Sequence, residues 1–201
     1  MSAILVTGFD PFGGAHINPS WEAVRRLPDT IGAFRLEKLQ VPTVFTAAGQ
    51  TVLSRCQSLQ PRAIVCVGQA GGRDSITPEV IAINLREAGI PDNRGFCPNA
   101  SPVIPGAPDG YFSTLPIRPI VQSIRAARYP AKLSYSAGSF VCNDLLFTLL
   151  HHYRDTDTLV GFLHVPYLPE QTETAPSMPL PDITAALTAA LTTLAEFLEA
   201  N

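Results

Sequence analysis

The stretch Ala63-Ile64-Val65-Cys66-Val67-Gly68 is an unbroken apolar run that ends in a glycine. Its length and its β-branched residues are typical of a strand buried on both faces, as in parallel sheets. Strand-like runs also occur before it, at residues 4–9 and 34–41, and after it, at residues 159–167. The pattern predicts a mainly parallel central sheet.

Segments with helical character separate these strands. Asn18 is a candidate N-cap with Pro19 at the first helical position, which predicts a helix that continues to residue 27. Asp182 is a candidate cap for a long amphipathic helix that ends at residue 200. Other helices are expected at residues 42–59, at 116–127 and from Cys142 onward.

The remaining segments read as extended chain or loop. Residues 79–85 and 132–138 have extended character. Residues 91–114 are dense in Pro, Gly, Asn and Asp, as in a long loop that is functional or mobile. Alternating strands and helices favour a three-layer α/β/α sandwich with a mainly parallel, twisted central sheet. We expect residues 1–201 to form a single domain.

The composition excludes several classes of protein. The chain has 201 residues, 46% of them hydrophobic, which is enough for a globular core. A formal net charge of -3 argues against nucleic acid and anionic membrane surfaces as partners. The chain opens on a strand-like segment without a signal-peptide pattern, and its apolar runs read as too short or too interrupted to span a bilayer. A cytoplasmic location is therefore predicted.

The four cysteines are Cys56, Cys66, Cys97 and Cys142. None belongs to a C-x-x-C pair, which argues against a structural zinc site, and a cytosolic chain keeps its thiols reduced. We therefore expect no metal and no cofactor. Each cysteine is then either buried packing or a reactive thiol, and redox roles for Cys56, Cys66 and Cys97 stay open.

Cys142 is the candidate nucleophile. It lies in residues 136–144 (SAGSFVCND), where small residues lead into a helix. Unpaired N–H groups and the dipole at a helix N-terminus favour a thiolate and lower the pKa of the thiol. The same N–H groups can donate hydrogen bonds to an oxyanion. The alternative is a small residue that packs at a strand-to-helix corner.

His164 and Glu79 are candidate partners of this thiol. His164 lies near the end of a predicted strand, one element away from Cys142, and is placed to accept its proton. Glu79 opens an extended segment and can orient the imidazole by accepting its N–H. The alternatives are a structural histidine and an exposed charge.

Two glycine-rich loops are expected at the carboxyl ends of strands, where sites gather in parallel sheets. Residues 8–14 (GFDPFGG) lack the lysine and hydroxyl of a phosphate loop, but Phe9 and Phe12 can clamp a small flat ring. Residues 68–74 (GQAGGRD) offer close approach to the backbone, or form a plain turn.

Several motifs together resemble one known family. In chain order they are TGFDPFGG, NPSWE, VGQAGGR, TPEVIAIN, IPDNRG, SAGSFVCN and HVPYLPEQ, and they cover residues 4–172. This set resembles the pyroglutamyl peptidase I (pyrrolidone-carboxylate peptidase) family of cysteine peptidases. The resemblance implies an α/β/α sandwich that removes N-terminal pyroglutamyl residues from peptides. It also implies a cytosolic enzyme without a cofactor, usually a homotetramer.

The resemblance also assigns site residues. It implies Cys142 as nucleophile, His164 as base and Glu79 as the acidic orienter. The lactam pocket that it implies is formed by Phe9, Phe12, Gln69, Ile90, Phe140 and Val141, with Asn18 helping to hold the first loop of the pocket.

The chain departs from the family's pattern at two positions. Gly89 stands where many members carry an arginine, for which nearby Arg86 is a possible substitute, and Asp144 stands where many carry a histidine. The effect of Gly89 is left open.

Two other functions remain alternatives at this point. A nucleoside phosphorylase or related transferase on a similar sheet would need a phosphate site, for which the glycine loops are the only candidates. A binding domain would use the aromatic loop without a reaction. Hydrolysis of a pyroglutamyl amide would exclude both.

Overall fold

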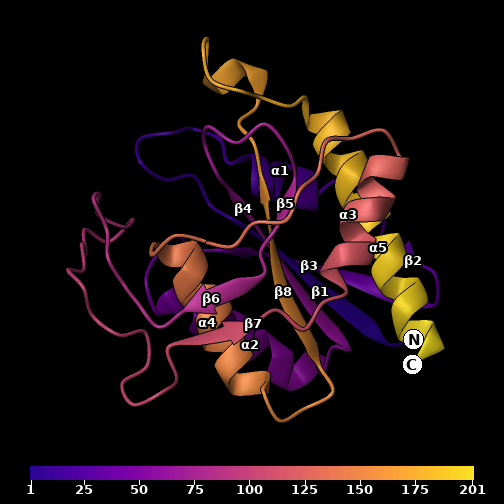
Figure 1. The fold of residues 1–201 in the computed structure, drawn as a ribbon, viewed down its shortest axis with the longest axis horizontal. Helices are drawn as coiled ribbons and strands as arrows, with labels where there is room; N and C mark the ends of the chain where they lie inside the picture. Colours follow the sequence, from indigo (N-terminus) through magenta and orange to yellow (C-terminus); the bar gives the residue numbers. More distant parts are fainter.

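The computed structural model describes residues 1–201, built around a six-stranded sheet (Figure 1). The strand order is β2-β3-β1-β4-β8-β5. The four inner strands are parallel, and β2 and β5 pair antiparallel at the two edges. The strands are β1 (Ala3–Phe9), β2 (Thr30–Ile31), β3 (Phe34–Val41), β4 (Ala63–Gln69), β5 (Thr77–Pro78) and β8 (Leu159–Val165). The predicted mainly parallel sheet is confirmed.

Helices cover both faces of this sheet. One apolar core lies between the sheet and α1, α3 and α5, and a second lies between the sheet and α2 and α4. Figure 1 shows α3 and α5 side by side on one flank and α2 with α4 on the other. The helices are α1 (Pro19–Val24), α2 (Ala47–Leu59), α3 (Ile117–Ala126), α4 (Val141–Tyr153) and α5 (Leu180–Ala200). The molecule is therefore an α/β/α sandwich, as expected.

Helix α5 corrects one expectation. By length and composition alone it is apolar enough to cross a membrane, so the view that every apolar run is too short is wrong for this segment. The same test is passed by core helices, and the buried residues of α5 recur every three or four positions, from Ile183 to Leu198. They pack in the core with α1 and α3.

Helix α2 begins at Ala47, not at residue 42 as predicted. The amides before it are bonded to carboxylates from distant segments instead of entering a helix. Thr43 N–H donates to Asp10 Oδ1 at 2.6 Å, and Phe45 N–H donates to an Asp92 oxygen at 3.0 Å. These long-range bonds hold residues 43–46 in a loop that a local pattern does not reveal.

Other boundaries also differ from the prediction. Helix α1 ends at Val24, and α5 begins at Leu180 with Pro179 at the N-cap, which places Asp182 in the first turn. Residues 132–138 form no strand and contribute only an isolated bridge at Ser134. The loop at 91–114 contains β7 (Gly110–Phe112), which pairs with β6 (Ile81–Ile83) in a second, two-stranded sheet.

The predicted extended segment 79–85 is split by this second sheet. The chain leaves the main sheet after β5 and enters β6 two residues later, so Glu79 lies at the point of departure. Its amide still donates to Phe162 O at 2.9 Å, which holds it beside β8.

Candidate active site

The neighbouring strands β4 and β8 set the floor of the site. Gly68 and His164 are partners in register, so their side-chain positions face the same side of the sheet. Phe162, two residues before His164, belongs to the core on the α2 and α4 side. His164 therefore faces helix α4.

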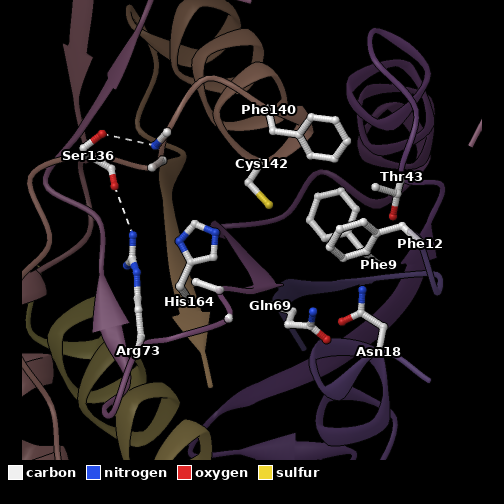
Figure 2. Close-up of a pocket in the computed structure, with 14 residues that line it drawn as sticks. Phe9, Phe12, Asn18, Thr43, Gln69, Arg73, Ser136, Phe140, Cys142 and His164 are labelled. Atoms are coloured by element: carbon white, nitrogen blue, oxygen red, sulfur yellow. Dashed lines mark hydrogen bonds between the residues drawn. The ribbon is translucent and has the colours of Figure 1, made fainter. Parts of the chain in front are cut away.

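Gly68 leaves room for a thiol. A Cβ atom at this position would lie 2.9 Å from Cys142 Sγ and 2.6 Å from Phe162 Cζ, closer than real Cβ contacts. Figure 2 shows the sulfur of Cys142 above the sheet with the imidazole of His164 facing it. The structure thus brings these two residues together, although no hydrogen bond joins them at rest. Such contacts often tighten only when substrate binds.

Helix α4 presents Cys142 in its first turn. The helix begins at Val141, and the first turn has no intrahelical acceptors for its N–H groups. The amide of Asp144 makes the first bond of the helix, to Phe140 O at 3.1 Å. The amides around Cys142 are therefore available to an oxyanion.

The next residue of the helix anchors it to the second sheet. Asn143 is fully buried, its Oδ1 accepts from Ile83 N–H at 2.9 Å, and its Nδ2 donates to Ile83 O and Leu85 O. All of these partners are backbone groups. The position of Cys142 is therefore fixed by the residue that follows it.

Asp144 anchors the helix to a different segment. Its buried carboxylate accepts the Thr46 N–H at 2.8 Å and pairs with the guanidinium of Arg86. Arg86 is thus paired with Asp144 and does not line the pocket. The structure therefore does not support Arg86 as a substitute for an arginine at position 89. A Cβ atom at Gly89 would meet nothing within 4 Å.

Glu79 completes the group around His164. Its side chain is fully buried, and His164 Nδ1–H donates to its Oε1 at 2.7 Å. This bond leaves the other ring nitrogen, Nε2, free to act on Cys142. The predicted pairing of Glu79 with His164 is present.

The charge states differ from the sequence-based expectation. Burial, reinforced by the nearby Glu79 carboxylate, raises the pKa of Cys142 to about 12, so the predicted lowering at the helix N-terminus is wrong for the free protein. Burial also lowers the pKa of His164, against the opposing effect of Glu79. Although burial opposes it, the hydrogen bond and charge of His164 keep the pKa of Glu79 below its usual value. At neutral pH the site therefore holds a thiol and a neutral imidazole.

A cavity of about 350 Å³ opens above Cys142 and His164. Five of the seven predicted pocket residues line it: Phe9, Phe12, Asn18, Gln69 and Phe140. Two do not. Val141 is fully buried in the core, and Ile90 is 49% exposed and lines an adjoining groove. Ile90 lies there because the 88–97 loop passes outside the aromatic wall, where Phe96 packs on Phe45.

The cavity has two kinds of wall. On one side are the aromatic rings, with Phe12 and Phe140 at a centroid distance of 6.1 Å (Figure 2). On the other side are small residues and one cation from the loop after β4 and from the segment that leads into α4: Ala70, Gly71, Arg73, Ser136, Ala137 and Gly138. Thr43 also lines the cavity, and no sequence signal singled it out.

Gln69 and Asn18 provide the polar groups at the base of the aromatic side. Gln69 Oε1 accepts from Gln171 Nε2 at 2.9 Å, while the amide nitrogen of Gln69 has no partner in the protein. Asn18 caps α1 through Ser20 N–H and donates to Asp10 O, so it also holds the first loop, as expected. Gln171 was missed because its partner lies 102 residues away. No cluster of three or more His, Cys, Asp or Glu side chains is arranged to hold a metal ion.

Comparison with known proteins gives one consistent result. The family model described as pyroglutamyl peptidase matches residues 2–197. The pyrrolidone-carboxylate peptidase of Enterococcus faecalis is 47% identical over 92% of this chain and 89% of its own length. That of Thermococcus onnurineus is 45% identical over 91% of this chain and 94% of its own length.

Solved structures agree with this result. Pyroglutamyl peptidase I of Bacillus amyloliquefaciens superposes with a TM-score of 0.94 at 46% identity, covering 98% of both chains. A mutant pyrrolidone carboxyl peptidase of Pyrococcus furiosus gives a TM-score of 0.93 at 36% identity, covering 98% of this chain and 99% of its own. This chain therefore belongs to the pyroglutamyl peptidase family of cysteine peptidases.

Proposed function

We propose that this protein removes N-terminal pyroglutamyl residues from peptides by acyl transfer through Cys142, with His164 as general base and acid. The observation that carries the proposal is the placement of the Cys142 sulfur over Gly68, beside an imidazole held by Glu79. Family membership supports the same reaction. Glu79 orients the imidazole and stabilises its protonated form during the reaction.

The raised pKa of the thiol determines how the first step proceeds. His164 Nε2 takes the S–H proton as the sulfur attacks the pyroglutamyl carbonyl carbon, and the carbonyl oxygen becomes an oxyanion to which the first-turn amides of α4 donate hydrogen bonds. The imidazolium then protonates the leaving amine, and the C–N bond breaks to leave a thioester. Water, deprotonated by His164, attacks the thioester and releases pyroglutamate while the thiol regains its proton.

The cavity suits a neutral lactam ring. Phe9, Phe12 and Phe140 supply apolar contacts for the ring, and the free amide nitrogen of Gln69 can donate to the lactam oxygen. Asn18 supports this wall through the first loop. Proline lacks that oxygen and would leave the Gln69 donor unpaired, so a prolyl amide should be a far poorer substrate.

The test is hydrolysis of a fluorogenic pyroglutamyl amide before and after treatment with iodoacetamide, with the alkylated cysteine mapped by mass spectrometry. Cys142→Ala should abolish turnover, and His164→Ala should be nearly inactive while its circular dichroism is unchanged. Glu79→Gln should lose less activity than Glu79→Ala, because the amide oxygen still accepts a hydrogen bond. Cys97→Ala, which removes an exposed thiol, is the matched control and should remain active. Normal turnover by Cys142→Ala would exclude the mechanism.

We also propose, on the family resemblance, that the chain works as a single cytoplasmic domain without a cofactor and assembles as a homotetramer. Light scattering on the purified protein tests the assembly, and a monomeric mass that retains full activity would contradict it.

A further inference from the structure

Arg73, in the loop after β4, contacts the same carboxylate oxygen as the catalytic histidine. Its Nη1 lies 2.7 Å from Glu79 Oε1, and His164 Nδ1 lies 2.7 Å from that oxygen. The other oxygen, Oε2, is buried and has no hydrogen-bond partner. The two hydrogen bonds from His164 and Arg73 to the carboxylate are therefore both made at Oε1.

The same guanidinium also reaches the segment that leads to the nucleophile. Arg73 Nη2 donates to Ser136 O at 3.1 Å, as Figure 2 shows, and Nη1 donates to the hydroxyl of Thr77. Ser136 begins the small-residue wall of the cavity that continues into α4. Arg73 thus joins three parts of the site that lie on separate segments of the chain.

We infer that Arg73 is a positioning residue, which holds the Glu79 carboxylate on His164 and ties that carboxylate to the Ser136 wall of the cavity. This inference rests on the proposed function. Arg73 need not touch the substrate, because it acts through Glu79 and through the Ser136 wall. A carboxylate with one free oxygen would otherwise be able to turn away from the imidazole.

The charges around His164 support this role. The groups that face it are Glu79 from the segment after β5, Arg73 from the loop after β4 and Cys142 from α4, with Cys66 behind the thiol. After burial, which is the main cause, the charge of Arg73 contributes to the lowered pKa of His164 and opposes the rise in the pKa of Cys142. Removal of this charge should raise the pKa of both groups.

The experiment compares Arg73→Gln and Arg73→Lys with the unmodified protein. In Arg73→Gln, kcat/KM for the pyroglutamyl amide should fall by about tenfold or more, and the acidic limb of its pH profile should move to higher pH. Alkylation of Cys142 by iodoacetamide at a fixed pH should slow, a readout that needs no turnover. Arg73→Lys should keep the acidic limb near its original pH but lose activity, because one ammonium does not bridge Glu79 and Ser136.

The control is Arg55→Gln, which breaks an ion pair of the same 2.7 Å length with Glu37, away from the cavity. It should leave the pH profile and the alkylation rate unchanged. A pH profile and alkylation rate in Arg73→Gln that superpose on those of the parent would overturn the role of Arg73, even if its stability falls. That result would not contradict the proposed reaction, because the unmodified protein would still hydrolyse the pyroglutamyl amide. An unmodified protein without this activity would contradict the proposed reaction itself.

Discussion

At the scale of the residue, the site depends on a position in β4 that must lack a Cβ atom. Gly68 has no side chain, and the Cys142 sulfur occupies the space above it, next to His164. The requirement is steric, since the atoms that a Cβ would meet belong to a fixed aromatic ring and to the nucleophile itself. Sequence reasoning treated this glycine as part of a loop that allows close approach, without identifying what approaches.

Gly68→Ala should therefore reduce activity by displacing the thiol or the ring of Phe162. We expect kcat/KM for the pyroglutamyl amide to fall by about tenfold or more, with a loss of about 1–3 kcal/mol in the free energy of unfolding from overpacking. Gly89→Ala is the control, because a Cβ atom there meets nothing within 4 Å. Activity of Gly68→Ala equal to that of Gly89→Ala would show that the space above Gly68 is not needed.

The sequence predicted that Cys142, His164 and Glu79 lie together, as they do in the structure, but it did not predict their charge states. Position at a helix N-terminus suggested a lowered pKa for the thiol, whereas burial beside Glu79 raises it to about 12. Local sequence reveals the helix but not the depth at which its first turn is buried. The motifs also did not reveal that Val141 is buried in the core or that Ile90 lines an adjoining groove, since a motif does not say which side of a wall a residue faces.

At the scale of the element, the N-terminal end of helix α4, which carries Cys142, has no side-chain N-cap and is held by other side-chain contacts. Phe140 provides no capping hydrogen bond, while Asp144 binds Thr46 N–H and the Arg86 guanidinium. Asp144 also places a negative charge in the first turn, where the helix dipole favours it.

Asp144→Asn should consequently be strongly destabilising. Removing one partner of a buried ion pair leaves the other charge uncompensated, so the free energy of unfolding should fall by about 3 kcal/mol. Urea unfolding followed by circular dichroism measures this loss. Asp155→Asn is the matched control, because the pair between Asp155 and Arg154 is exposed and should contribute less than about 1 kcal/mol. Equal midpoints for the two variants would contradict the anchoring role of Asp144.

The elements also show where prediction from sequence succeeds. The buried strands at residues 3–9, 63–69 and 159–165 were found because continuous apolar runs mark strands covered on both faces. The strand at 34–41 was also predicted, although it contains charged residues and is only partly buried. The short strands β5 and β7 were not predicted, because they are held by partners distant in sequence, whereas β6 lies within the extended segment predicted at residues 79–85. The predicted start of α2 was wrong for a similar reason, since carboxylates from distant loops accept hydrogen bonds from the amides that precede the helix.

At the scale of the whole molecule, thiol and phenol groups with raised pKa values make the stability of the fold decrease at alkaline pH. Burial raises the pKa of Cys56, Cys66, Cys142 and Tyr153. A group whose pKa is higher in the folded state than in the unfolded state binds more protons when folded. Its stabilising contribution is complete below the unfolded pKa and is lost as the pH rises above it.

The melting temperature should therefore decline steadily above about pH 8.5, where cysteine thiols of the unfolded chain begin to ionise. Differential scanning calorimetry between pH 8 and pH 10.5 measures the decline, and Cys66→Ala should make it shallower. A single calorimetric transition is expected if residues 1–201 form one domain. A melting temperature that stays constant over this range would show that the buried thiols do not govern stability.

The position of β8 within the sheet has a consequence for biosynthesis. This strand lies between β4 and β5, although both precede it in the chain, and it carries His164. A growing polypeptide on the ribosome therefore presents Cys142 before the base that would activate it has been translated. The acyl transfer proposed for Cys142 therefore requires the strand that completes the sheet, because that strand carries its proposed base.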